Sequence, residues 1–287
     1  MAVFSPSRRL SVALALGLMA AAHFAVPLTA HAAGDPTKPA TYAPDDGLLT
    51  LLDGRAAAFK EQVAAPDIQA IVAGVERLAA SIQQGDLAGS RQAWIDVRVI
   101  WARCEAFTAD LFPGLEKAMN QWPDATTGFH AVEAKLYAQM PQEPLQEAQQ
   151  LVDSAHTYQH VFTQSKFTGY YLIAGASTLA YEMGETVNEG GESPASGNSL
   201  GDLRHNLEGV ERIWRFVFAD SVRAKKHYLA EQIDEQILKI RGMLGATSLD
   251  QIQPEAFHRE AEKLASQLAN ASVLLGWRAP DYTDIGE

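Results

Sequence analysis

The spacing of apolar residues constrains the fold of this chain more than any other feature of its sequence. From about residue 46 onward, apolar residues recur every three or four positions, and the strict alternation of a half-buried strand is nearly absent. This periodicity is typical of amphipathic α-helices. Prolines, glycines and the expected N-cap residues Asp67 and Asp86 divide the sequence into helices. These are expected at 46–64, 67–84, 86–112, 127–140, 145–164, 168–188, 200–242 with a break near Lys225, and 254–276.

The order of these helices predicts an all-α fold made of two packed four-helix bundles. Four helices lie on each side of the proline-containing turn at 141–144, which places the bundles at 45–140 and 145–277. The turn is too short to be a flexible linker, so we expect the bundles to pack as one unit. The segments expected outside the helices are an irregular connection at 113–125, an exposed loop at 189–199 and a tail at 278–287.

The first 32 residues have the composition of a secretory signal. Two arginines precede an apolar run over residues 10–22, and a small-x-small pattern at 30–32 marks a cleavage site. We therefore expect cleavage between Ala32 and Ala33, a periplasmic location, and a short segment at 33–44 before the first helix. A retained membrane anchor is the alternative.

The charge balance narrows the possible partners. The 287 residues carry a net charge of −12, and removal of residues 1–32 takes away two arginines and no acid, which leaves −14. An acidic surface repels nucleic acid and attracts cations. We expect no nucleic-acid partner.

A histidine and a glutamate stand three positions apart within one expected helix. His130 and Glu133 share a helix face beside the apolar stripe of Phe129, Val132 and Leu136. They can therefore present a nitrogen and an oxygen to one point, as metal ligands or as an acid/base pair. The pair is expected to be at least half buried.

Two further carboxylates are candidates for the same site. Glu105 shares a stripe with Trp94 and Trp101, where a carboxylate is costly unless a cation neutralises it. That cation could be a metal, or Arg98 or Arg103 in a salt bridge. Glu182 forms a three-residue pair with Glu185, a spacing that by itself favours a solvated face.

The remaining candidates have less support from their surroundings. Asp124 precedes the His130 helix and would have to fold back to it from a loop. His156 and His160 have a metal-capable spacing, but the residues between them indicate an ordinary helix surface. His205 and Glu208 repeat the spacing of His130 and Glu133 without the same apolar flank, and His258 with Glu262 is expected to be a surface pair.

The segment 128–137 resembles the Gly-x-His-x-x-Glu signature of imelysin-like proteins, particularly the EfeO and EfeM type of periplasmic iron-uptake component. Residues 101–107 resemble the acidic helix before that signature, and residues 175–182 resemble the helix after it. The likeness continues through 189–193, 199–203 and 206–210, and covers residues 45–277.

This resemblance implies a metal site made of His130, Glu133, Glu105 and Glu182. Glu105 corresponds to the second acid of the family's Glu-x-x-Glu pair, and Ala102 stands where the family has the first acid. The resemblance also implies a membrane iron permease and a haem peroxidase as partners. The N-terminal cupredoxin-like domain of longer relatives has no counterpart here, which implies the shorter form.

Three functional classes follow from these features. The first is a periplasmic protein that binds iron or zinc through the His-x-x-Glu site and passes it to a permease; mixed nitrogen and oxygen ligands fit either metal. The second is an imelysin-type metallopeptidase, which has less support because a His-Glu-x-x-His pair is missing. The third binds an anionic polysaccharide through a bridging metal.

Overall fold

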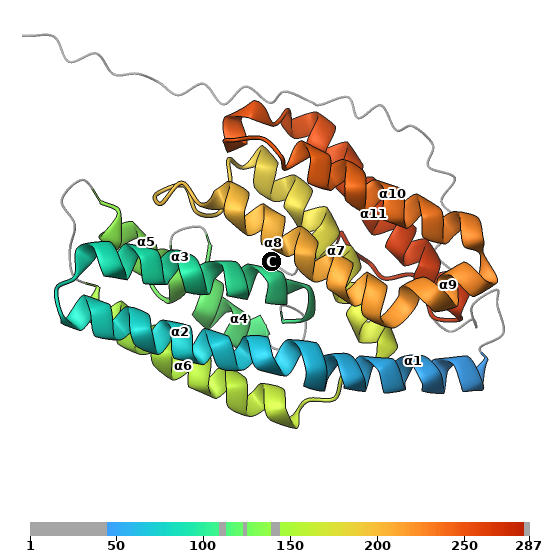
Figure 1. Cartoon of the computed structure of the whole chain (residues 1–287), viewed down its shortest axis with the longest axis horizontal. Helices are drawn as coiled ribbons and strands as arrows, with labels where there is room; N and C mark the ends of the chain where they lie inside the picture. Colours follow the sequence, from blue (N-terminus) through green and yellow to red (C-terminus); the bar gives the residue numbers. More distant parts are fainter. Residues whose placement is uncertain (1–44, 109–112, 123–124, 139–143, 284–287) are drawn as a thin grey trace, which may run out of the picture.

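The computed structural model describes residues 45–108, 113–122, 125–138 and 144–283, and helices with no strand make up this part of the chain (Figure 1). The α-helices are α1 Asp46–Phe59, α2 Ala65–Gln83, α3 Leu87–Cys104, α4 Pro113–Asn120, α5 Gly128–Leu136, α6 Leu145–Gln164, α7 Gly169–Asn188, α8 Ser199–Ile213, α9 Ala219–Lys225, α10 His227–Met243 and α11 Pro254–Leu275. The short turns are the π-helical η1 Lys60–Ala64 and η3 Trp214–Phe218 and the 3-10 turns η2 Glu105–Phe107 and η4 Leu249–Gln251. The prediction of an all-α fold is confirmed. The expected signal peptide and Asp124 lie outside the described residues.

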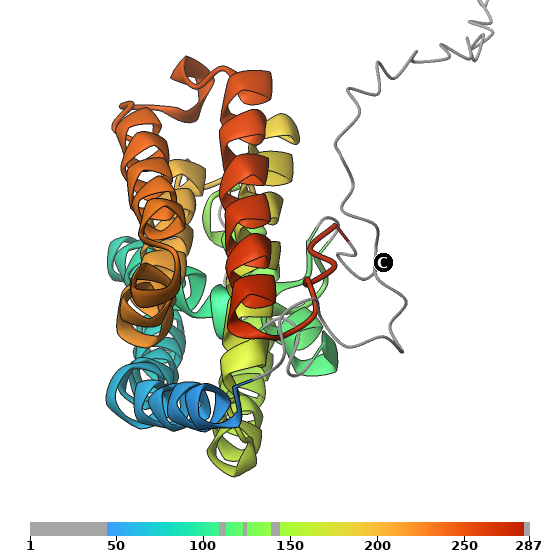
Figure 2. The same ribbon diagram turned by 90° about the vertical axis from the view of Figure 1, so that its right-hand side faces the viewer.

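The helices pack in two groups. In the first group, α2 contacts α3 and α6, and the short α4 and α5 lie against α6. In the second group, α7 contacts α8 and α11, and α10 contacts α11; Figure 2 shows the orange α10 and the red α11 side by side. The contact of α3 with α8 joins the groups, so they form one unit. Within the described residues, no helix combines the length and the apolar character needed to span a bilayer.

The boundary between the groups differs from the expected one. The sequence placed residues 145–164 in the second bundle, but α6 packs against α2, α4 and α5 of the first group. Its Tyr158 ring lies 5.5 Å from the ring of Trp101 on α3, which shows how its apolar stripe is buried. The division therefore falls between α6 and α7, and not at 141–144.

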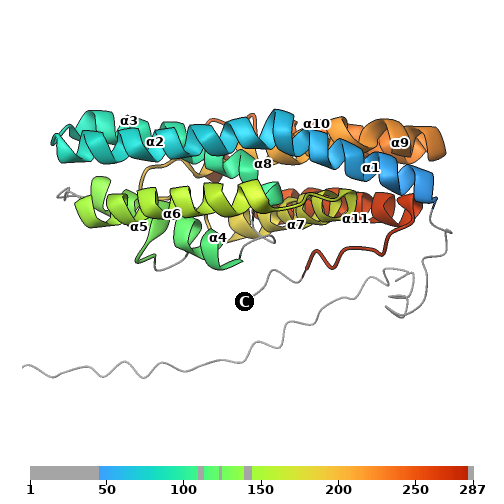
Figure 3. The ribbon, with the colours of Figure 1, turned by 90° about the horizontal axis from the view of Figure 1, so that it is seen from below.

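The helix expected to end before Pro66 continues through it. The amide of Ala65 donates to the carbonyl of Lys60, so η1 is one widened turn between α1 and α2. Pro66 lacks an amide hydrogen and its ring crowds the preceding turn. The π turn accommodates both effects, and α1, η1 and α2 form one rod along the molecule (Figure 3).

Other boundaries show which local signals were reliable. The break expected near Lys225 is present, because the backbone of Lys226 is not helical (φ −151°, ψ 83°) between α9 and α10. The expected irregular connection contains a helix, α4. Asp86 caps α3 by accepting a hydrogen bond from the Gly89 amide at 2.9 Å, as predicted. Asp67 does not cap α2, because the helix is continuous from η1 into α2 at this position and the Asp67 side chain is buried.

Asp67 instead binds two arginines from other helices. Its carboxylate accepts hydrogen bonds at 2.6 Å from Arg103 on α3 and at 2.6 Å from Arg212 on α8. This ion-pair cluster ties α2, α3 and α8 together at the contact between the two groups.

Candidate functional site

The His130–Glu133 pair lies on α5 and is buried, as the sequence predicted. The two residues are 3% and 2% exposed, and His130 Nδ1 lies 3.1 Å from Glu133 Oε2. The short α5 is held against α3, because Trp94 Nε1 donates to the Phe129 carbonyl at 2.9 Å. Helical spacing brings the pair together, and packing on α3 removes it from water.

Gly128 sets the entry of α5. Its φ is +76°, and a Cβ at this position would lie 2.3 Å from the Met119 carbonyl oxygen of α4. The left-handed conformation favours glycine, and the close approach leaves no room for a side chain. The glycine of the signature is therefore explained by backbone geometry two residues before His130.

The loop 189–198 covers Glu133. Ser196 donates its amide to Glu133 Oε1 at 2.8 Å and its hydroxyl to the same oxygen at 2.7 Å. This segment was expected to be an exposed loop, but Gly191 and Ser193 are buried and only part of it faces solvent. The carboxylate of Glu133 is therefore bonded on both oxygens.

The second nitrogen of His130 has no hydrogen-bond partner in the described part of the chain. Nε2 is buried, and the ring of Trp122 lies 5.2 Å from the imidazole. If Nδ1 carries the hydrogen and donates it to Glu133, Nε2 presents a lone pair. A buried imidazole held by a carboxylate is the usual arrangement of a metal-binding histidine.

A fully buried arginine, Arg98 on α3, gathers carboxylates beside this pair. Its guanidinium lies 3.0 Å from Glu105, 2.5 Å from Glu192 and 3.5 Å from Asp202. Asn120 of α4 accepts from Arg98 at 2.8 Å and donates to Glu105 at 2.9 Å. Glu105 therefore forms a salt bridge with Arg98, one of the two alternatives raised by its sequence position.

The cluster has more acid than base. Burial raises the pKa of Glu105 well above its usual value, although Arg98 acts in the opposite direction. Burial likewise raises the pKa of Asp202. Burial would lower the pKa of Arg98, but Asp202, Glu105 and Glu192 raise it above its ordinary value and hold its charge. One guanidinium thus faces three carboxylates, a setting that favours an added proton or cation.

The expected ligands are only partly brought together. His130 and Glu133 meet, Glu105 belongs to the Arg98 cluster, and Glu182 is half-buried on α7. Across the described residues, no group of three or more His, Cys, Asp or Glu side chains is arranged to hold a metal ion. Sequence reasoning missed Arg98 as the centre of the cluster, together with Glu192, Ser196 and Asp202.

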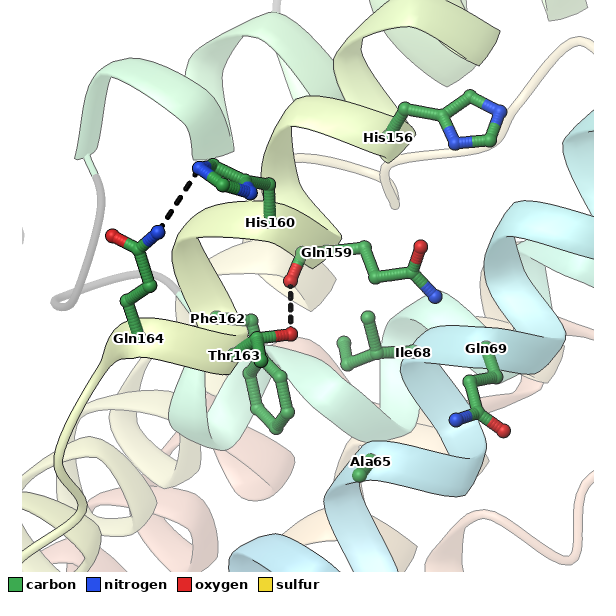
Figure 4. Close-up of a pocket in the computed structure, with 9 residues that line it drawn as sticks. All are labelled: Ala65, Ile68, Gln69, His156, Gln159, His160, Phe162, Thr163 and Gln164. Carbon is green, nitrogen blue, oxygen red and sulfur yellow. Dashed lines mark hydrogen bonds between the residues drawn. The ribbon is translucent and has the colours of Figure 1, made fainter.

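The other histidines considered as ligands, His156, His160, His205 and His258, lie apart from this centre. His205 donates Nδ1 to the Gly201 carbonyl at 2.8 Å, and His258 Nδ1 lies 3.1 Å from Glu185. His156 and His160 line a groove of about 410 Å³ between α2 and α6, where their rings point in different directions (Figure 4). His156 lies 3.0 Å from Glu76, and His160 lies 3.0 Å from Gln164. The pair does not converge on one point.

The fold and this centre define a class: two packed helical groups with a buried His-x-x-Glu pair beside a carboxylate cluster. The imelysin family, peptidase family M75, matches residues 56–127 and 124–275. The chain belongs to this family, and the resemblance seen in the sequence is confirmed.

Curated relatives and one solved structure agree. Iron-regulated protein A of Synechococcus elongatus is 26% identical over 264 residues, which cover 66% of this chain and 74% of the relative. An Efem/EfeO family lipoprotein of Staphylococcus aureus is 24% identical over 247 residues, 81% of this chain and 84% of the relative. The crystal structure of an iron-regulated protein A precursor from Parabacteroides distasonis shares the fold, with a TM-score of 0.62 at 15% identity over 83% of this chain and 96% of that one.

Proposed function

We propose that this protein binds an iron ion through His130 as part of an iron-uptake system and passes it to a membrane permease. The names of two relatives, an iron-regulated protein A and an Efem/EfeO family lipoprotein, support the link to iron. A periplasmic location after signal cleavage, with a haem peroxidase as a further partner, belongs to the same proposal. Zinc is the alternative metal, since imidazole and carboxylate ligands suit both.

The observation that carries this proposal is the burial of the His130 ring and the different hydrogen bonding of its two nitrogens. Its Nε2 is buried and has no hydrogen-bond partner among the described residues, which costs free energy unless a ligand binds there. Its Nδ1 is held by Glu133, so the ring is oriented before any metal arrives. The surplus of buried carboxylates around Arg98 favours a positive ligand nearby.

The roles within the expected ligand set then separate. We propose His130 as a direct ligand and Glu133 as the carboxylate that orients it, because both Glu133 oxygens already accept hydrogen bonds. Glu105 can contribute its negative charge while bound to Arg98, and would have to leave the guanidinium to bind metal directly. Glu182 stays a proposed ligand from the family pattern.

The metallopeptidase alternative has less support from the geometry. A catalytic zinc site needs three protein ligands and an open water position. Among the described residues, no three His, Cys, Asp or Glu side chains are arranged around one point, so the geometry does not supply that ligand set.

Metal analysis and titration calorimetry test the proposal. Purified protein is titrated with iron(II) under argon and with zinc(II), alongside the variants His130→Ala and His205→Ala. We expect one ion per chain in wild type, and at least about ten-fold weaker binding in His130→Ala. His205→Ala is the matched control, since His205 also precedes a glutamate by three residues. Equal binding by all three proteins would show that His130 holds no metal.

A further inference from the structure

The loop 189–198 is attached to the charged groups of the centre at three points. Glu192 pairs with Arg98 at 2.5 Å, and Ser193 donates its hydroxyl to Asp202 at 2.5 Å. Ser196 donates its amide and hydroxyl to Glu133. Between these contacts, the tip at Pro194 and Ala195 is exposed. The loop is therefore positioned by the same side chains that surround His130.

The hydroxyl of Ser196 has a defined orientation. It accepts a hydrogen bond from the Asn198 amide at 3.2 Å, and its own hydrogen has two possible acceptors, Glu133 Oε1 at 2.7 Å and the Ser193 carbonyl at 3.3 Å. A hydroxyl donates one hydrogen, and a bond to a carboxylate is stronger than one to a carbonyl. Ser196 therefore donates to Glu133.

These bonds form a chain from the loop to the imidazole. Ser196 holds Glu133 Oε1, and Glu133 Oε2 faces His130 Nδ1. A group that bonds directly to a metal-binding imidazole commonly changes metal affinity by about ten- to a hundred-fold, and here that group is Glu133, which Ser196 holds in place. The chain ends at Nε2, which is buried beside the ring of Trp122.

We propose that Ser196 is a positioning residue through which the loop 189–198 contributes to the metal site. Ser196 fixes the Glu133 carboxylate, and Glu133 fixes the His130 ring with Nε2 directed toward the ligand. Without the Ser196 hydroxyl, Glu133 Oε1 keeps only the hydrogen bond from the Ser196 amide, and the imidazole is held less firmly. Bound metal therefore leaves more slowly when the hydroxyl is present. This inference rests on the proposed function of His130.

The test measures how fast bound metal is released. Zinc-loaded wild type, Ser196→Ala and Ser196→Thr are mixed with an excess of a fluorescent chelator, and the dissociation rate is recorded. We expect release from Ser196→Ala to be about ten-fold faster, and release from Ser196→Thr, which keeps the hydroxyl, to be close to wild type. Ala195→Ser, at the exposed tip, is the control and should not change the rate. Ser196 is only half-buried, so the helical circular dichroism signal should be the same in all four proteins.

A second measurement uses wild type alone. Hydrogen exchange of the Ser196 amide, which donates to Glu133, should become slower when zinc is added. Unchanged exchange, or a Ser196→Ala protein that releases metal at the wild-type rate while His130→Ala loses binding, would overturn the positioning role and leave the proposed function standing. Metal binding that does not depend on His130 would overturn both.

Discussion

The Arg98 guanidinium lies 3.0 Å from the Glu105 carboxylate, and both side chains are buried at the junction of α3, α4 and the loop that precedes α8. The pair joins residues seven positions apart, yet its other partners come from distant parts of the chain. The burial of Glu105 should make the stability of the fold depend on pH.

Stability should depend on pH through Glu105. Burial raises the pKa of Glu105 well above the value of about 4.3 that a glutamate has in an unfolded chain. Between those two values the folded protein binds more protons, so the contribution of this group to the free energy of unfolding is largest at acid pH and falls as pH rises through the raised pKa. Glu105→Gln removes this dependence. Relative to wild type, the variant should therefore become more stable as pH is raised from 5 to 8 in thermal unfolding.

Glu189→Gln is the control for that series, because Glu189 is exposed. Its stability difference from wild type should stay flat across the same pH range. A difference for Glu105→Gln that is equally flat would show that the buried carboxyl titrates as it does in the unfolded chain.

Glu133→Gln should weaken iron and zinc binding by about ten-fold while the helical content is retained. A neutral amide can still accept from His130 Nδ1, but it no longer increases the basicity of the imidazole. Glu208→Gln, beside His205, has the same spacing and should leave binding unchanged. Calorimetric titration measures both, and a full-strength Glu133→Gln protein would contradict the orienting role.

Gly128→Ala should destabilise the protein by about 2 kcal/mol or more. The position combines a φ of +76° with a Cβ that would lie 2.3 Å from the Met119 carbonyl oxygen. Gly242→Ala is the matched control, since its Cβ would meet nothing within 4 Å on α10. That change should be neutral or stabilising by up to about 1 kcal/mol in urea unfolding. Similar losses for both variants would rule out the steric explanation.

Asp67→Asn should lower the free energy of unfolding by about 2–3 kcal/mol. The change leaves Arg103 and Arg212 facing each other across a neutral amide, although both guanidinium groups are partly exposed and so partly hydrated. Arg215→Ala, which removes an exposed ion pair with Glu211, should cost less than about 1 kcal/mol. Urea titration compares the two, and an Asp67→Asn protein as stable as Arg215→Ala would contradict this assignment.

Short-range sequence signals correctly predicted those features of the fold that depend on neighbouring residues alone. The 3.6-residue period located the helices, Asp86 marked a helix start, and the His130–Glu133 spacing correctly indicated a shared face. Pro66 misled because the rule that proline ends a helix assumes a regular turn, and a widened turn removes the conflict. The sequence could not show this, because the turn is stabilised by packing of the rod on both groups.

The centre was only partly predictable for a different reason. Arg98 shares the stripe of Trp94 and Trp101, so its burial could have been inferred, but its carboxylates could not. Glu192 lies 94 positions away along the chain, and Ser196 lies 63 positions from Glu133. Helical periodicity predicts neither contact, because the loop that carries Glu192 and Ser196 joins α7 to α8, and its position depends on the packing of α8 on α3 and of α7 on η2.

The rod formed by α1, η1 and α2 limits how this molecule can respond to a ligand (Figure 1). Its α2 end packs in the first group and its α1 end contacts α7 and η3 in the second. Two lobes that swing about a hinge, as in clamshell solute-binding proteins, would have to bend this rod. A loaded molecule should therefore keep the outline of an empty one, with the same radius of gyration. A partner that collects the cargo would therefore have to recognise a local difference between the loaded and the empty protein, and the exposed loop tip at Pro194 and Ala195 is the place we expect for it.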